Sequence, residues 1–149
     1  CAVLGAGGAA RSVVHALAQA GASEVVVINR TPERAEVAAR LAGPAGRVGS
    51  NVDLPRADIV INATSVGMGA GIGDTGPLPC PEDSFRRGQV VVDLVYQPVT
   101  TPLLEVAAAN GAHAVDGLGM LVHQAAISLR RWTGVDPDLA VMHRAARSI

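Results

Sequence analysis

"CAVLGAGGAARSVVHALAQAG", residues 1–21, decides the fold of this chain, since a short apolar run leads through a glycine cluster into a helical pattern. Residues 1–5 have the composition of a buried strand, and residues 10–21 repeat apolar side chains at helical spacing. Between them, Gly5 to Ala10 follow the pattern G-x-G-x-x-A. A glycine motif that leaves a strand and opens a helix predicts a turn that binds the pyrophosphate of a dinucleotide.

Each small residue of this turn has its own physical reason. Gly5 permits the tight turn, Gly7 lets a pyrophosphate approach the backbone because it has no Cβ, and Ala10 keeps the helix close to the sheet. The unpaired N–H groups and the dipole of a helix that begins near Gly8 attract phosphate. The alternative interpretation is a tight strand-to-helix turn that binds no ligand.

The end of the second predicted strand indicates which dinucleotide is bound. Asn29 stands where NAD-binding units place an Asp or Glu on the ribose hydroxyls. Arg30 follows it, and Arg34 lies one helical turn later. A guanidinium pairs with a 2′-phosphate, which a carboxylate would repel. These residues therefore predict NADP rather than NAD, and the alternative is that the arginines are merely solvated at the start of a helix.

Apolar runs alternate with helical patterns along the whole chain. We predict strands at 1–5, 23–30, 46–49, 57–64, 89–96 and 112–117, and helices at 10–21, 31–43, 101–111, 119–134 and 136–149. Thr31 and Asp136 are the expected N-caps of two helices. The strands are continuous apolar runs, which is typical of a parallel sheet buried on both faces. We therefore expect a Rossmann-like, doubly wound α/β fold with a mainly parallel sheet of about six strands and helices on both faces. Residues 66–88 are rich in Gly and Pro and predict a long loop.

Composition limits the classes of function. With 149 residues, 49% hydrophobic residues and a net charge of −1, the chain predicts one globular domain and no nucleic-acid partner. The sequence has neither an apolar run of membrane-helix length nor a signal-peptide pattern, so we expect a cytoplasmic protein without a membrane partner. Cys1 and Cys80 fit no metal or redox spacing, so no metal site is expected. The 12 basic residues are all arginine, so the chain supplies no lysine for acid–base chemistry.

Several stretches together resemble the shikimate dehydrogenase family. They are "GAGGAARS", "NRTPERA", "INATSVGM", "VVDLVYQPVTTPLL" and "DGLGMLVHQAA", in this order and over nearly the whole chain. The first two are shared with many dehydrogenases, whereas the last two are much more specific. The resemblance is to the C-terminal NADP-binding domain, which here would span residues 1–149. It implies reversible reduction of 3-dehydroshikimate to shikimate with NADPH, in the biosynthesis of chorismate and aromatic amino acids.

The resemblance assigns residues to parts of the ligands by matching position. For the pyrophosphate it implies Gly5, Ala6, Gly7, Gly8 and Ala9, and for the 2′-phosphate end of the cofactor Asn29, Arg30, Thr31 and Arg34. For the nicotinamide half it implies Thr64, Leu94, Gly117 and Met120, and for the substrate Tyr96 and Gln124. Within this second set, Thr64, Leu94, Tyr96 and Gly117 follow the ends of predicted strands. Open α/β sheets bind their ligands beyond the carboxyl ends of the strands, so these positions agree with the implied roles.

Some of these side chains also have a structural interpretation. Tyr96 would then cap the fifth strand, Gln124 would hydrogen-bond within its helix, and Met120 would belong to the core. Asp93 and Asp116 stand at strand ends before turns. We expect these two carboxylates to stabilise the turns rather than to act as general bases.

The resemblance also implies a second domain. Family members pair this domain with an N-terminal substrate domain, which supplies a catalytic Lys–Asp pair and most contacts to the hydroxyls of the substrate. The abrupt start at Cys1 and the lack of lysine agree with an isolated domain. We therefore expect no catalytic residue in this chain, weak NADP binding and no oxidation of shikimate. The closing helices at 117–149 would pack partly on that domain, and their exposure would favour a homodimer.

Two alternatives to an NADP-dependent shikimate dehydrogenase stay open at the level of sequence. One is a quinate/shikimate dehydrogenase that prefers NAD, against which Arg30 and Arg34 argue. The other is a non-catalytic dinucleotide-binding module. Tyr96 and Gln124 argue against the module, because a cofactor sensor has no need of residues on the substrate side.

Overall fold

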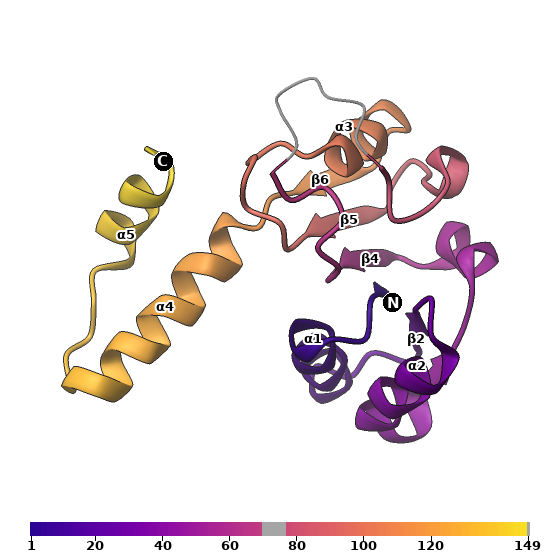
Figure 1. The fold of residues 1–149 in the computed structure, drawn as a ribbon, viewed down its shortest axis with the longest axis horizontal. Helices are drawn as coiled ribbons and strands as arrows, with labels where there is room; N and C mark the ends of the chain where they lie inside the picture. The colour runs from indigo at the N-terminus through magenta and orange to yellow at the C-terminus, as the bar shows by residue number, and fades with distance from the viewer. Residues whose placement is uncertain (70–76, 149) are drawn as a thin grey trace.

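A six-stranded parallel sheet lies at the centre of the part of the chain that the computed structural model describes, residues 1–69 and 77–148 (Figure 1). Its strands are β1 (Ala2–Leu4), β2 (Val25–Ile28), β3 (Gly46–Val48), β4 (Ile59–Asn62), β5 (Val90–Asp93) and β6 (His113–Val115). They lie in the order β3-β2-β1-β4-β5-β6, and every neighbouring pair is parallel. The winding direction reverses between β1 and β4, which confirms the predicted Rossmann-like class.

Helices cover both faces of this sheet. On one face, α1 (Gly8–Gln19) and α2 (Pro32–Ala39) pack in a cluster that contains Val3 and Val14. On the other face, α3 (Pro102–Ala109) and the 3₁₀ segment η2 (Asn51–Arg56) pack in a cluster that contains Leu4, Leu54 and Leu103. Successive side chains of β1 thus enter opposite clusters, as the pleat requires. Burial on both faces explains why the strands are continuous apolar runs.

Most element boundaries follow the predicted signals, but the helix predicted at 31–43 is shorter. Thr31 is the N-cap of α2 and Pro32 its first residue, as predicted. The helix ends at Ala39, and the chain continues as the 3₁₀ segment η1 (Arg40–Ala45). Gly43 adopts a φ of 57° inside that segment and Pro44 follows it, so a regular helix cannot reach residue 43.

The predicted cap of the last helix is wrong by two residues. Asp138, not Asp136, caps α5 (Leu139–Ala146), and its Oδ1 accepts hydrogen bonds from the backbone N of Ala140 at 2.8 Å and of Val141 at 3.1 Å. Asp136 instead lies 3.2 Å from Nε of Arg130. Only the carboxylate directly before the helix reaches its first free amides. A further 3₁₀ turn, η3 (Glu82–Ser84), lies in the long loop predicted for 66–88, of which residues 70–76 lie outside the described residues, as does residue 149.

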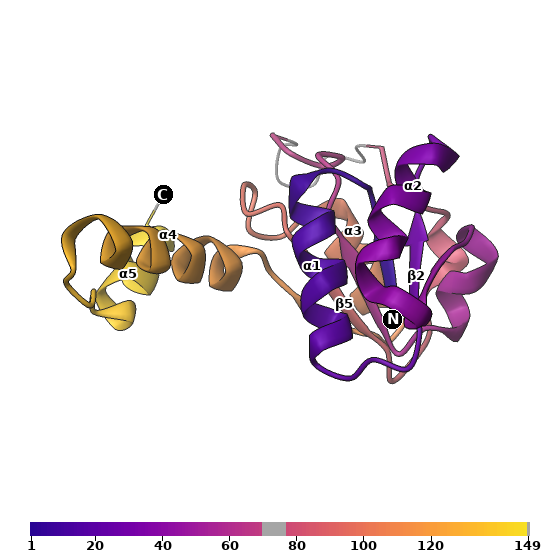
Figure 2. The same cartoon turned by 90° about the horizontal axis from the view of Figure 1, so that it is seen from below.

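The closing helices form an arm that extends from the sheet domain (Figures 1 and 2). α4 (Leu118–Thr133) is followed by its C-cap Gly134, which has a φ of 73°, and α5 returns alongside it. Apolar side chains exposed on the arm are Met120, Ile127, Leu129, Trp132, Val135, Leu139 and Val141. Helices long and apolar enough to cross a membrane do not occur in the described residues.

Candidate functional site

A cleft of about 630 Å³ opens beyond the carboxyl ends of β1, β2, β3 and β4. It lies on both sides of the point where the sheet reverses its winding, which is where open α/β sheets bind ligands. Its lining residues are Leu4, Gly5, Ile28, Asn29, Arg30, Thr31, Arg34, Gly49, Ser50, Asn51, Thr64, Ser65, Val66 and Pro79. Six residues assigned to the cofactor from sequence are therefore brought together here, namely Gly5, Asn29, Arg30, Thr31, Arg34 and Thr64.

The glycine turn presents open backbone beside this cleft. Gly5 has a φ of 105°, and a Cβ there would lie 3.0 Å from the carbonyl oxygen of Ala63, so the fold itself requires glycine. A Cβ at Gly7 or Gly8 would meet no heavy atom within 4 Å. Gly7 is the N-cap of α1, no side chain caps the helix, and no acidic residue stands in its first turn. The first amides of α1 can therefore donate to an anion.

Two arginines make the β2 side of the cleft positive. Asn29 Nδ2 donates a hydrogen bond of 3.0 Å to the carbonyl oxygen of Thr31, which fixes the turn between β2 and α2. Arg30 follows on this turn and Arg34 lies in the first turn of α2, and both are exposed and line the cleft. Within residues 1–69 and 77–148 neither guanidinium forms an ion pair. The described lining contains no Asp or Glu, so this end of the cleft suits an anion such as a phosphate ester.

Sequence reasoning missed the third wall of the cleft, which Gly49, Ser50 and Asn51 form after β3. Asp53 holds this turn, because its Oδ2 accepts from the backbone N of Ser50 at 2.9 Å. Gly49 fits only as glycine, since a Cβ would overlap the side chains of Val26 and Asp53. The pattern S-x-x-D at residues 50–53 is a capping signal that could have found this wall.

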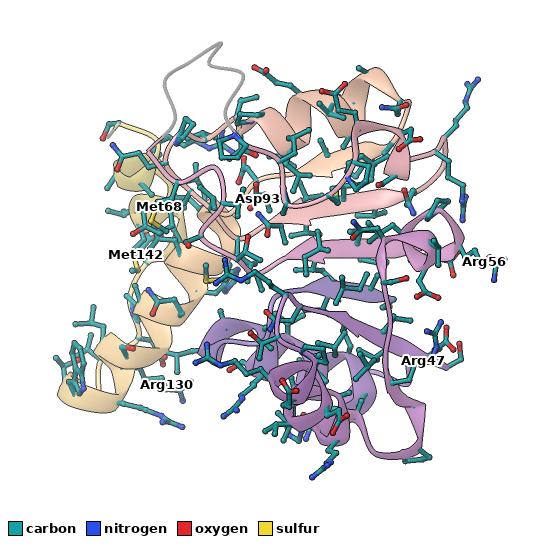
Figure 3. The ribbon with its side chains drawn as sticks, turned by 45° about the vertical axis from the view of Figure 1, so that its right-hand side comes forward. Arg47, Arg56, Met68, Asp93, Arg130 and Met142 are labelled. Atoms are coloured by element: carbon teal, nitrogen blue, oxygen red, sulfur yellow. The ribbon has the colours of Figure 1, made fainter. Side chains whose placement is uncertain are left out.

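Arg47 ties this wall to the sheet and changes the acidity of its neighbours. Its guanidinium donates to Asp53 Oδ1 at 2.8 Å and to Glu24 Oε1 at 2.8 Å. Hydrogen bonding to Arg47 lowers the pKa of both carboxyls, and the backbone N of Ser50 also lowers the pKa of Asp53. Figure 3 shows Arg47 at the edge of the sheet, far from Asp93 in the interior.

A buried polar network lies under the β4 side of the cleft. Asp93, Asn62 and Thr101 are each fully buried. Asp93 Oδ1 accepts from Asn62 Nδ2 at 2.9 Å, and Asp93 Oδ2 accepts from Thr101 Oγ1 at 2.6 Å. Asn62 Oδ1 accepts from both the N and the Oγ1 of Thr64, at 3.0 and 2.7 Å. Burial raises the pKa of Asp93, although the hydrogen bonds from Thr101, Val95 and Asn62 act in the opposite direction.

The predicted roles of Asp93 and Asp116 in turns are confirmed. Asp93 Oδ1 also accepts from the backbone N of Val95 at 3.0 Å, and Asp116 Oδ1 accepts from the backbone N of Leu118 at 3.0 Å. Gly117 packs closely between these turns. A Cβ there would lie 2.7 Å from the carbonyl oxygen of Val95, so only glycine brings the start of α4 against the end of β5.

Several other residues assigned from sequence lie outside the lining of the cleft. They are Ala6, Gly7, Gly8, Ala9, Leu94, Tyr96, Gly117, Met120 and Gln124. Met120 is 38% exposed, which contradicts its alternative assignment to the core. Gln124 Nε2 donates to the carbonyl oxygen of Leu121 at 3.2 Å, which is the bond within the helix that the structural interpretation expects. Tyr96 is exposed beyond the end of β5. The roles of these residues toward ligands stay predictions.

The strand order, the glycine turn and the cleft at the switch point define a Rossmann-like domain of the dinucleotide-binding class. Comparison with known proteins narrows this class. The family described as "Shikimate / quinate 5-dehydrogenase" matches residues 1–68, and the "Shikimate 5'-dehydrogenase C-terminal domain" matches residues 117–147. This chain belongs to the shikimate dehydrogenase family.

Individual relatives agree with the family match. "Shikimate dehydrogenase (NADP(+))" of Moorella thermoacetica is 46% identical over 155 residues, which cover 97% of this chain and 52% of that protein. Shikimate 5-dehydrogenase of Thermus thermophilus, in complex with NADP(H) and shikimate, superposes with a TM-score of 0.87 at 41% identity, over 99% of this chain and 54% of that one. Quinate dehydrogenase of Corynebacterium glutamicum, in complex with NAD, gives 0.86 at 29% identity, over 99% and 54%. The chain spans about half the length of these relatives.

Proposed function

We propose that this chain is the NADP-binding half of a shikimate dehydrogenase, which reversibly reduces 3-dehydroshikimate to shikimate. The observation that carries the proposal is the pair of arginines, Arg30 and Arg34, which face a cleft whose described lining holds no acidic residue. A 2′-phosphate is the group that distinguishes NADP from NAD, and a guanidinium is its natural partner. The Moorella thermoacetica relative, named as an NADP(+) enzyme, supports the same cofactor.

The residues of the cleft and of the glycine turn beside it fit separate parts of NADP. The open backbone at Gly7 and Gly8 and the first amides of α1 would hold the pyrophosphate, because no side chain stands in their way. Arg30 and Arg34 would hold the 2′-phosphate, and Thr64 would lie toward the nicotinamide half. When bound, the cofactor would supply the hydride of the reaction. The chain itself would bind and orient it.

The cofactor preference is tested by titrating the chain with NADP and with NAD in a calorimeter. We expect Arg30→Ala to weaken NADP binding by about 10- to 100-fold, the equivalent of about 1.5–3 kcal/mol for a charged hydrogen bond, and to leave NAD binding unchanged. Arg40→Ala is the matched control, because Arg40 is exposed, pairs with Glu36 at 3.6 Å and lies outside the cleft lining. An unchanged ratio of NADP to NAD affinity in Arg30→Ala would refute the assignment. A wild-type preference for NAD would instead favour the quinate dehydrogenase alternative.

We further propose that the arm docks on a substrate-binding half, as the doubled length of the relatives suggests. The exposed apolar side chains of α4 and α5 are the surface that such a partner would cover. The chain contributes no lysine, so the Lys–Asp pair of the family would come from that partner. We expect the pure chain to bind NADP without oxidising shikimate, and a mixture with the N-terminal half of the Moorella thermoacetica relative to reduce NADP when shikimate is added. Shikimate turnover by the pure chain would contradict this.

A further inference from the structure

In the buried network at the ends of β4 and β5, the structure determines which group donates and which accepts in each hydrogen bond, starting at Asp93. Both oxygens of this carboxylate accept hydrogen bonds, from Asn62 Nδ2 and the backbone N of Val95 at Oδ1 and from Thr101 Oγ1 at Oδ2. An ionised carboxylate is an acceptor only. Asn62 must therefore turn its NH₂ group toward Asp93 and its carbonyl oxygen away from it.

The orientation of Asn62 in turn determines the hydrogen bonds of Thr64, which lines the cleft. The carbonyl oxygen of the Asn62 side chain faces Thr64, where it lies 3.0 Å from the backbone N and 2.7 Å from Oγ1. An amide oxygen cannot donate, so the hydroxyl of Thr64 must give its only proton to Asn62. The reverse orientation of the amide would set two acceptors against each other at Asp93 and two donors against each other at the N of Thr64.

Thr64 is consequently left with acceptor capacity alone. Its Oγ1 has two lone pairs, and one of them accepts from the backbone N of Val66 at 3.2 Å. Thr64 lines the cleft, so the second lone pair is what its hydroxyl can offer to a ligand. A hydroxyl or an amide N–H could bind there, whereas a phosphate oxygen could not, because it too is an acceptor.

We propose that Asp93 is a positioning residue that, through Asn62, makes Thr64 a hydrogen-bond acceptor for a donor group of the dinucleotide. The proposal rests on the proposed function, since it takes NADP as the ligand. It places a ribose hydroxyl or the carboxamide of NADP against Thr64 and excludes the pyrophosphate. Asp93 itself lies under the cleft and touches no ligand, so its effect on binding must pass through Thr64.

The same arrangement explains how a buried carboxylate is tolerated. Thr101 is the N-cap of α3, and its Oγ1 accepts from the backbone N of Leu104 at 3.4 Å while it donates to Asp93. The charge therefore lies beside the N-terminus of a helix, where negative charge is stabilised. Thr101 supports Asp93 from the side opposite Asn62, so it bears on stability without determining the direction of the hydrogen bond at Thr64.

A double-mutant cycle tests the coupling. The wild type, Asp93→Leu, Thr64→Val and the double variant are titrated with NADP, and folding is checked by circular dichroism. Leucine replaces Asp93 here because the oxygen of an asparagine could still accept from Asn62 Nδ2 and the backbone N of Val95, which both bind Oδ1. We expect each single change to weaken binding by about 5- to 10-fold, which corresponds to one lost hydrogen bond, and the double variant to bind no more weakly than the weaker single variant. Thr64→Ser should keep the wild-type affinity. Losses that multiply in the double variant would overturn the proposal, even though NADP still binds. A wild type that does not bind NADP would overturn the proposed function as well.

A second measurement does not depend on whether Asp93→Leu folds. Inorganic pyrophosphate carries neither a ribose hydroxyl nor a carboxamide, so it should compete at the glycine turn without using Thr64. We expect Thr64→Val to weaken NADP by about 5- to 10-fold while the affinity for pyrophosphate stays as in the wild type. An equal loss for both probes would overturn the proposal. Thr101→Val is the matched control, because it should lower stability yet leave the affinity for NADP within about 2-fold.

Discussion

Gly5 and Gly7 belong to one turn but serve different purposes. Gly5 has a φ of 105° and lies against the backbone of Ala63, so we expect Gly5→Ala to lower the free energy of unfolding by about 1–3 kcal/mol. Gly7 has a φ of −76° and open space around it, so Gly7→Ala should change stability by less than about 0.5 kcal/mol. Its methyl group would nevertheless occupy the space proposed for the pyrophosphate. Urea unfolding and NADP titration of both variants separate the two effects, and wild-type NADP affinity in Gly7→Ala would speak against a ligand at this turn.

The residues that sequence reasoning found are those whose chemistry is set by their chain neighbours. Gly5 and Arg30 could be predicted because a strand end and a helix start flank each of them. Asn62 could not, because its role depends on Asp93, which lies 31 positions away and is brought close only by the pairing of β4 with β5. Gly49 was missed for a similar reason, since the side chains that force it to be glycine include Val26 of the neighbouring strand.

At the scale of elements, Asp93 joins the end of β5 to β4 and to the start of α3, and its titration should be visible in stability. Burial raises the pKa of Asp93 in the folded state above its ordinary value. The folded state then binds a proton at a pH where the unfolded chain does not, so the contribution of this group to stability rises as pH falls through its folded pKa and is smallest at higher pH. We expect the free energy of unfolding of the wild type, relative to Asp93→Asn, to increase on acidification.

This pH dependence can be measured by urea unfolding of both proteins from neutral pH down toward pH ~4, the region of an unperturbed aspartate. Asp83→Asn is the matched control, because it removes the carboxyl of an exposed aspartate on the turn η3. Glu24 and Asp53 have lowered pKa values and contribute in the opposite sense, but they are present in all three proteins and cancel in the comparison. A difference between wild type and Asp93→Asn that is constant with pH would contradict the buried-charge explanation.

Elements were predictable where one strong signal dominated. All six strands of the sheet lie within the predicted ranges, since an apolar run buried on both faces is hard to mistake. The 3₁₀ segments η1 and η2 were not predicted, because each holds a proline inside and follows no helical period. The cap of α5 was misplaced because Asp136 and Asp138 both flank Pro137, and only the geometry of the backbone decides between them.

At the scale of the whole molecule, the cleft lies in the sheet domain and the exposed apolar surface lies on the arm. The cleft and the network beneath it are formed within the sheet domain, whereas α5 has no buried residue at all. Trp132 is 82% exposed and Ile127 59% exposed on α4. Large apolar side chains gathered on one projecting element are unusual for a surface that stays in water. The arm thus has the character of a contact surface, independent of the cleft.

We expect this surface to drive self-association of the chain when no partner covers it. Sedimentation velocity should show a weight-average mass that rises with concentration. The double change Ile127→Glu with Trp132→Glu should remove that rise, because it replaces two of the exposed apolar side chains of the arm with charges. NADP affinity should be unchanged in this variant, since neither residue lines the cleft. Val52→Glu is the matched control, because Val52 is 77% exposed but lies on η2 rather than on the arm, and it should associate like the wild type. A wild type that sediments as a monomer at every concentration would contradict this prediction. The binding of a partner to the arm would then require more specific contacts than the burial of apolar surface.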